Sequence, residues 1–90
     1  MKRLKLTISG QVQAVGFRYF VERMAEKLEL NGYVKNREDN QVEVLVEGEE
    51  GKLKRLLELC QKGPVLSKVE KVKVRWMKCQ EEFDSFEIEN

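Results

Sequence analysis

The chain has 90 residues, of which 41% are hydrophobic and 37% charged, so its apolar content suits one core and one domain over residues 1–90. Its 17 basic and 16 acidic residues give a formal charge of +1, which argues against nucleic acid or an anionic membrane as a partner. It contains no histidine, which excludes imidazole as a base, as a nucleophile activator and as a metal ligand. Any catalysis must then work by positioning and charge stabilisation.

The chain begins with a predicted strand, a loop and a helix. Leu4, Leu6 and Ile8 alternate with polar residues, which is the period of a half-buried strand. Residues 10–16 break that pattern with two glycines and no charge. From Phe17 to Leu28 the apolar residues recur at helical spacing, which predicts an amphipathic helix.

A hairpin is predicted after this helix. Asn31 and Gly32 end the helix, as a glycine after the last turn usually does. Residues 33–37 form a short strand, residues 38–41 a turn, and residues 42–46 a strand in which valine alternates with other residues.

The second half repeats the order of helix and strand. Acidic residues at 49–50 suit the positive end of a helix, and leucines with Cys60 supply its apolar stripe. Gly63 and Pro64 stop it. Residues 72–76 alternate as a fourth strand, and residues 86–88 mark a short last strand.

This βαββαβ order, with its short C-terminal strand, predicts an α+β fold. The simplest closed arrangement is a ferredoxin-like sandwich, an antiparallel sheet with both helices on one face. In that fold the third strand lies between the first two. Arg18, after the first strand, and Asn36, at the end of the second, then share one edge of the sheet.

The start of the first helix indicates an anion site. Arg18 places a cation at the positive end of the helix, and no Ser, Thr, Asp or Asn precedes it as a cap. A bound phosphate would accept hydrogen bonds from the unsatisfied N–H groups and offset this charge. The alternative is that Gly16 caps weakly and Arg18 points into solvent.

Two segments carry a family resemblance. Residues 8–18, ISGQVQAVGFR, resemble the phosphate-binding signature of acylphosphatases. Residues 32–48 resemble the second signature of that family, and the similarity extends over essentially the whole chain. Ala14 stands where the family usually has Gly or His. Asn40 replaces the usual hairpin glycine, and asparagine tolerates a left-handed conformation.

The resemblance implies residue roles. Arg18 grips the phosphoryl oxygens and Asn36 positions the attacking water, so both are predicted to be catalytic. The implied substrate-binding residues are those of the loop and the first helical turn: Gln13, Ala14, Val15, Gly16, Phe17 and Arg18.

The resemblance also implies the activity, which is hydrolysis of the carboxyl-phosphate bond of acyl phosphates to a carboxylate and inorganic phosphate. We expect no metal and no cofactor, and no partner beyond these small molecules. We also expect a monomer. Cys60 and Cys79 form no CxxC pair, and no apolar run has the length of a signal peptide or a membrane span, so we expect a cytoplasmic protein with two reduced thiols.

Three alternatives remain open. The first is an acylphosphatase-like domain that binds carbamoyl or acyl phosphate without significant turnover, since similar domains occur inside larger hydrogenase-maturation proteins. A βαββαβ chain can also be an RNA-recognition module, but Glu43, Leu45 and Glu47 make one sheet face acidic rather than aromatic. A regulatory module for a small ligand is the third. Tyr19 is interpreted as part of a solvated helix face, and Trp76 as a packing residue.

Overall fold

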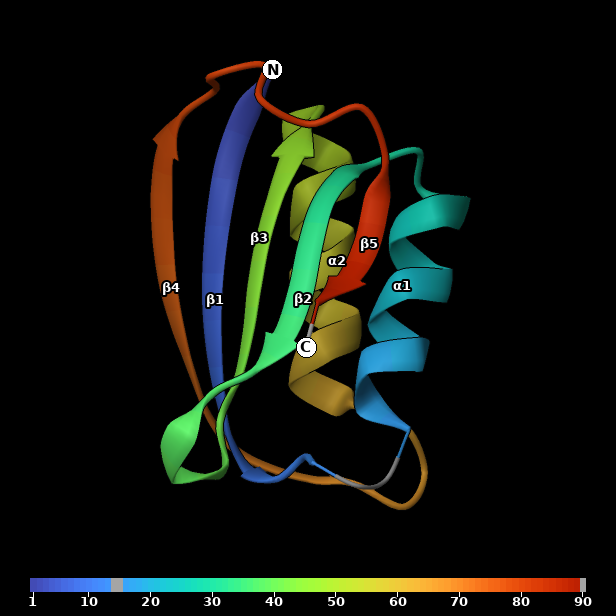
Figure 1. The fold of residues 1–90 in the computed structure, drawn as a ribbon, viewed down its shortest axis with the longest axis vertical. Helices are drawn as coiled ribbons and strands as arrows, with labels where there is room; N and C mark the ends of the chain where they lie inside the picture. The colour runs from blue at the N-terminus through green and yellow to red at the C-terminus, as the bar shows by residue number, and fades with distance from the viewer. Residues whose placement is uncertain (14–15, 90) are drawn as a thin grey trace.

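The computed structural model describes residues 1–13 and 16–89, and it confirms the predicted order of elements (Figure 1). The elements in chain order are β1 (Lys2–Gln11), α1 (Phe17–Lys27), β2 (Asn31–Asn36), the 3-10 helix η1 (Glu38–Asn40), β3 (Val42–Gly48), α2 (Glu50–Lys62), β4 (Lys68–Lys78) and β5 (Phe86–Glu89). None of the helices in this part of the chain is long and apolar enough to cross a membrane.

The strands form one sheet with the order β4-β1-β3-β2-β5, so β3 lies between β1 and β2 as expected. Every pair among the first four strands is antiparallel. The short β5 adds a parallel pair with β2, which makes the complete sheet mixed. This pairing extends the sheet on the side of α1 and brings the end of the chain close to the first helix (Figure 1).

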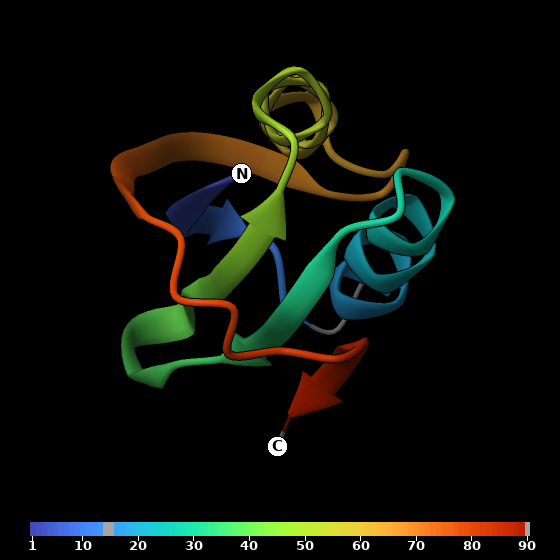
Figure 2. The same ribbon diagram turned by 90° about the horizontal axis from the view of Figure 1, so that it is seen from above.

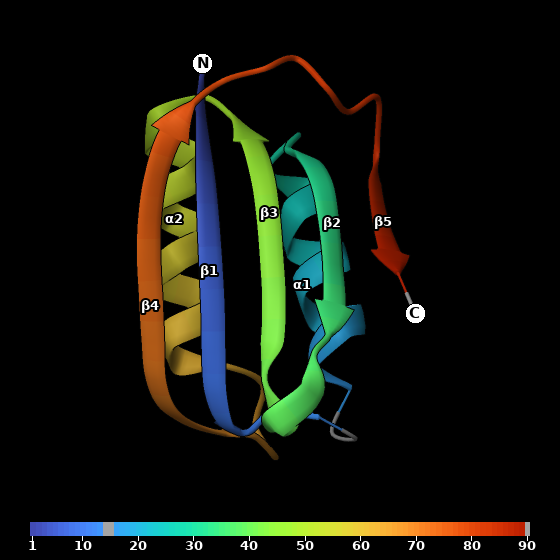
Figure 3. The same ribbon diagram turned by 60° about the vertical axis from the view of Figure 1, so that its left-hand side comes forward.

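Both helices cover one face of the sheet, and the core lies between them and the strands (Figures 2 and 3). Side chains of β1 and β3 that alternate toward the helices are fully buried, as the period of two predicts. The helices contribute their apolar stripes to the same cluster. Its strand and helix members include Leu4, Leu6, Ile8, Val42, Val44, Val46, Phe17, Val21, Ala25, Leu53, Leu56 and Cys60.

The other face of the sheet carries no helix (Figure 3). Its charged side chains pair with one another, and Arg3 donates to the carboxylate of Glu47 at 2.9 Å. Tyr33 also lies on this face, but its ring packs edge-on against Phe83 and its hydroxyl donates to Glu43. The aromatic groups on this face are therefore engaged within the protein.

The hairpin between β2 and β3 closes through two left-handed residues. The φ angle is 64° at Asp39 and 60° at Asn40, in the region that asparagine and aspartate tolerate best after glycine. This confirms that Asn40 can replace a hairpin glycine. Strand β2 begins at Asn31, two residues before its predicted start, and ends at Asn36.

Two sequence interpretations concern residues outside the site. Trp76 was expected to pack, but it lies on the edge strand β4 and is 39% exposed, because neither helix covers that edge fully. Cys60 is buried and Cys79 is half-buried, and neither forms a disulfide within the described residues.

Candidate active site

The N-terminus of α1 has no side-chain cap. Gly16 is the N-cap residue, with φ 74° and ψ 19°, and no side chain accepts a hydrogen bond from the first turn at this position. A left-handed φ suits glycine because it lacks a Cβ. No acidic residue lies in the first turn, which instead contains Arg18. The helix start therefore offers N–H donors and a cation to the same region of space.

The predicted residues on the described part of the loop converge on one cavity of about 220 Å³. Gln13, Gly16, Phe17, Arg18 and Asn36 all line it, together with Val12 and Tyr19. Ala14 and Val15, which are also predicted to bind substrate, lie outside the described residues. The α1 start and the end of β2 thus meet at one edge of the sheet, as the predicted topology requires.

Arg18 is half-buried at the mouth of this cavity. Its Nη1 donates to the carbonyl oxygen of Glu89 at 3.4 Å, so β5 contributes to holding the side chain. Phe17, the residue before it, is only 1% exposed and packs edge-on against Phe20. Because the Phe17 ring is in the core, its main-chain N–H is the group available for the predicted role in binding.

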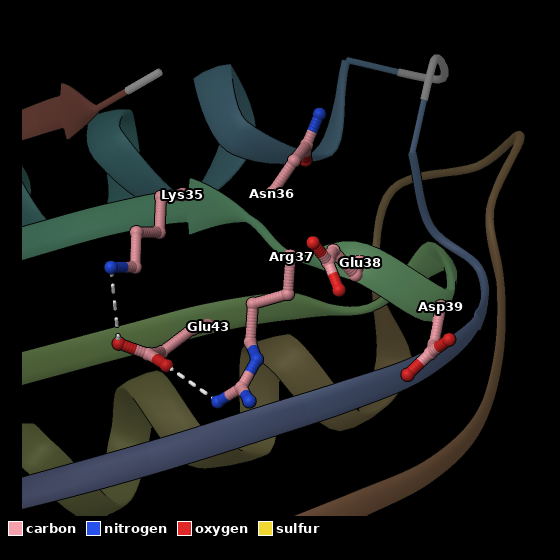
Figure 4. A pocket seen from close by; sticks show the side chains of 6 residues that line it. All are labelled: Lys35, Asn36, Arg37, Glu38, Asp39 and Glu43. Atoms are coloured by element: carbon pink, nitrogen blue, oxygen red, sulfur yellow. Dashed lines mark hydrogen bonds and ion pairs between the residues drawn. The ribbon is translucent and has the colours of Figure 1, made fainter.

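Asn36 faces the helix side of the sheet, with the same orientation as the buried Val34. Figure 4 shows its side chain pointing to the opposite side from Arg37 and Lys35, which reach toward Glu43. Its Oδ1 is buried, and no group in the described ranges hydrogen-bonds to it. Leaving a buried acceptor unsatisfied costs about 1–3 kcal/mol, so an orphan acceptor in a cavity indicates a place where a ligand or water binds.

Gln13 connects the loop to the hairpin that carries Asn36. Its Nε2 donates to the carbonyl oxygen of Arg37 at 2.9 Å and to that of Gln41 at 2.8 Å. Both hydrogens of the side-chain amide are therefore engaged within the protein. The predicted role of Gln13 in substrate binding then depends on its main-chain N–H.

Glu43 anchors the residue that follows Asn36, from the other face of the sheet (Figure 4). Glu43 is only 6% exposed. Its carboxylate accepts hydrogen bonds from Arg37 Nη1 at 2.7 Å and from the Tyr33 hydroxyl at 2.5 Å. Two lysine ammonium groups also lie within 4.0 Å of it. Burial acts to raise the pKa of Glu43, but the Tyr33 hydrogen bond and the surrounding cations outweigh it, so the pKa lies below its usual 4.5. The carboxylate is thus charged at neutral pH. The lysines are Lys5 and Lys35.

A second cavity, of about 490 Å³, lies beside this ion-pair network. Its lining residues are Lys35, Asn36, Arg37, Glu38, Asp39 and Glu43. It shares Asn36 with the smaller cavity. In this larger cavity the carboxylate of Glu43 is already paired with Arg37.

Val12 and Tyr19 line the cavity but were not predicted as site residues, and Val12 belongs to the buried core. Tyr19 is the exposed one of the two. It was assigned to a solvated helix face and it is 67% exposed, yet it lines the cavity beside Arg18. The available signal was its position: an aromatic ring next to the first-turn arginine on an otherwise charged face. No cluster of three or more metal-ligating side chains occurs among residues 1–13 and 16–89.

The fold and the cavity together define a class: a small α+β protein in which an uncapped helix start and the buried side-chain oxygen of Asn36 line one cavity. The sequence profile of the family described as Acylphosphatase matches residues 4–88. The acylphosphatase of Bacillus licheniformis is 46% identical over 88 residues, which cover 98% of each chain. The crystal structure of acylphosphatase from Bacillus subtilis matches with a TM-score of 0.96 and 40% identity, over 100% of both chains. The chain belongs to the acylphosphatase family and is, on that ground, a hydrolase.

The chain also resembles one segment of a much larger protein. It is 42% identical over 87 residues to the probable carbamoyltransferase HypF of Methanocaldococcus jannaschii, covering 96% of this chain and 11% of that one. The crystal structure of full-length HypF in its phosphate- and nucleotide-bound form matches with a TM-score of 0.87 and 30% identity, over 12% of its length.

Proposed function

We propose that this protein hydrolyses the carboxyl-phosphate bond of acyl phosphates, giving a carboxylate and inorganic phosphate. The observation that carries this proposal is the convergence of Arg18, the uncapped start of α1 and the orphan oxygen of Asn36 on one cavity. The first two suit a phosphoryl group and the third suits a water molecule. Together they can bind the two reactants of a hydrolysis, the phosphoryl group and the water, next to each other.

The loop over residues 13–18 and the guanidinium of Arg18 hold the phosphoryl group. Main-chain N–H groups at a helix start point at an anion and act with the positive end of the helix dipole. The planar guanidinium binds two oxygens at once and stays charged at any working pH. As the bond from the acyl oxygen to phosphorus lengthens, these fixed donors stabilise the charge on the group in transfer.

Asn36 positions the attacking water through its side-chain amide. An amide is too weak a base to remove the proton of that water, so the proton passes to a phosphate oxygen of the substrate. Water forms the new bond to phosphorus, and the acyl oxygen leaves with the bonding electrons as a carboxylate. A carboxylate is a good leaving group and needs little acid assistance, which fits a site without histidine.

The role needs no metal or other cofactor, because the charge stabilisation comes from Arg18 and the loop N–H groups. The proposal also includes a monomer in the cytoplasm that has no nucleic-acid partner. A formal charge of +1 and a charged sheet face whose side chains pair with one another support the absence of a nucleic-acid partner.

The second candidate function is binding of an acyl or carbamoyl phosphate without turnover. The likeness to one segment of HypF favours it. Asn36 favours hydrolysis, because a domain that only binds has no use for an amide that holds water beside the phosphoryl group. Catalysis therefore remains the first proposal.

One assay separates the two candidates. The purified protein is incubated with benzoyl phosphate or acetyl phosphate in the presence of EDTA, and the loss of acyl phosphate is followed against a protein-free control. We expect turnover that EDTA does not reduce. Binding of acyl phosphate with no loss above the control would support the second candidate and contradict the first.

A further inference from the structure

Arg37, the residue directly after Asn36, is held by three hydrogen bonds through its N–H, its side chain and its carbonyl oxygen. Its N–H donates to the carbonyl oxygen of Gln41 at 2.7 Å, which closes the hairpin. Its guanidinium donates to the buried carboxylate of Glu43 at 2.7 Å, on the open face of the sheet. Its carbonyl oxygen accepts from Gln13 at 2.9 Å. The third contact is the only one of these that comes from the loop before α1.

The side-chain amide of Gln13 makes this third contact and also a hydrogen bond to the carbonyl of Gln41. Gln13 Nε2 has two hydrogens, and it gives one to Arg37 and the other to the carbonyl of Gln41. Gln41 in turn donates through its own side chain to Ser9 Oγ at 3.0 Å, near the end of β1. The hairpin end is therefore tied to both the strand and the loop that lead into α1.

We propose that Gln13 is a positioning residue that couples the phosphate-binding loop to Asn36. It fixes the Arg37 carbonyl and the Gln41 carbonyl that accepts from the Arg37 N–H, and so restricts the backbone of the residue that directly follows Asn36. This inference rests on the proposed function, in which Asn36 positions the water. Gln13 itself does not touch the reacting atoms through its side chain. A displacement of the Asn36 amide by about 1 Å lowers the rate of the chemical step steeply, because the water is no longer in line with the phosphorus.

The test uses Gln13→Met, which keeps the length of the side chain and removes both donors. Gln11→Met is the matched control, because Gln11 lies two positions earlier in the chain and its side chain is exposed at the end of β1. We expect Gln13→Met to lower kcat for benzoyl phosphate by about tenfold and to change the affinity for inorganic phosphate by less than about threefold. Gln11→Met should change neither quantity. An equal loss of kcat and of phosphate affinity would overturn the proposal.

A double-mutant cycle with Asn36→Ala tests whether Gln13 acts through Asn36. Once Asn36 is removed, its direction no longer matters, so adding Gln13→Met should lower kcat by less than about twofold. A further tenfold loss in the Asn36→Ala background would show that Gln13 acts independently, and the coupling would be wrong.

A spectroscopic readout keeps the inference separate from the proposed function. The nitrogen–proton NMR signals of the Asn36 side-chain amide should shift or broaden in Gln13→Met and stay in place in Gln11→Met. If the wild-type protein does not hydrolyse acyl phosphates, the proposed function fails. The coupling fails separately if the Asn36 signals do not move.

A second variant covers the case in which Gln13→Met does not fold. Gln13→Glu keeps the shape of the side chain but replaces the donating NH₂ group with a carboxylate oxygen, which faces the carbonyl oxygens of Arg37 and Gln41. The protonated carboxyl can donate one hydrogen bond, so the activity of Gln13→Glu relative to wild type should rise as the pH falls from about 7 to about 5. A pH-independent ratio would contradict the donor role of Gln13.

Discussion

Arg18 Nη1 donates to the carbonyl oxygen of Glu89 at 3.4 Å, which joins the first turn of α1 to the last strand of the sheet. The parallel pairing of β5 with β2 makes this contact possible, because it brings the end of the chain back to the sheet edge where Asn36 lies. A half-buried arginine held in this way presents its guanidinium to the cavity with fewer accessible rotamers, which lowers the entropy that binding must offset.

Substitution of Arg18 by lysine tests the phosphate-binding role. Arg18→Lys keeps the charge but loses the planar fork, so we expect the affinity for inorganic phosphate to fall by about 1.5–3 kcal/mol, or roughly 10- to 150-fold. Isothermal titration or product inhibition measures this loss. Arg23→Lys, at an exposed position on the same helix, is the matched control and should bind as wild type does. Wild-type phosphate affinity in Arg18→Lys would show that the guanidinium does not bind the phosphoryl group.

Tyr19 is expected to influence the choice of acyl group. It lines the cavity beside Arg18 with an exposed ring, so an aromatic acyl group of the bound substrate can pack against it. Such ring pairs contribute about 0.5–1.5 kcal/mol, so Tyr19→Ser should lower kcat/KM for benzoyl phosphate relative to acetyl phosphate by roughly 2- to 12-fold. Tyr19→Phe should keep the wild-type ratio. An unchanged ratio in Tyr19→Ser would remove Tyr19 from substrate recognition.

Glu43 is expected to make the free energy of unfolding depend on pH in the acidic range. Its pKa is lower in the folded protein than its usual 4.5, so its contribution is fully present above that value and is lost as the pH falls through the lowered pKa. Glu43→Gln should cost about 2 kcal/mol of unfolding free energy at pH 7, because the charged hydrogen bonds to Arg37 and Tyr33 are weakened. Urea unfolding at several pH values measures this effect. The difference between the two proteins should shrink below pH 4.5, and a difference that grows in acid would contradict the assignment.

The elements and the site could be predicted from the sequence where a local rule decides the structure. Alternating Leu4, Leu6 and Ile8 fixed the inward face of β1, and the missing cap residue before Phe17 indicated the uncapped start of α1. The left-handed conformation of Asn40 also followed from its residue type.

Contacts between segments that are distant in the sequence could not be predicted by such local rules. The two carbonyl partners of Gln13 come from the hairpin, and no local spacing indicates which side-chain amide will reach a main-chain oxygen there. The half-exposure of Trp76 reflects its place on an edge strand that the helices do not fully cover, which depends on the order of the strands. Tyr19 was assigned to solvent because helical periodicity separates apolar from polar faces and does not identify a cavity at the end of a helix.

The most direct measurement compares Asn36→Ala with wild type for both turnover and phosphate binding. If Asn36 holds the attacking water while Arg18 and the loop hold the phosphoryl group, kcat for benzoyl phosphate should fall on the order of 100-fold, and the dissociation constant of inorganic phosphate should change by less than about threefold. Loss of phosphate affinity with kcat retained would contradict this division of roles between the two residues.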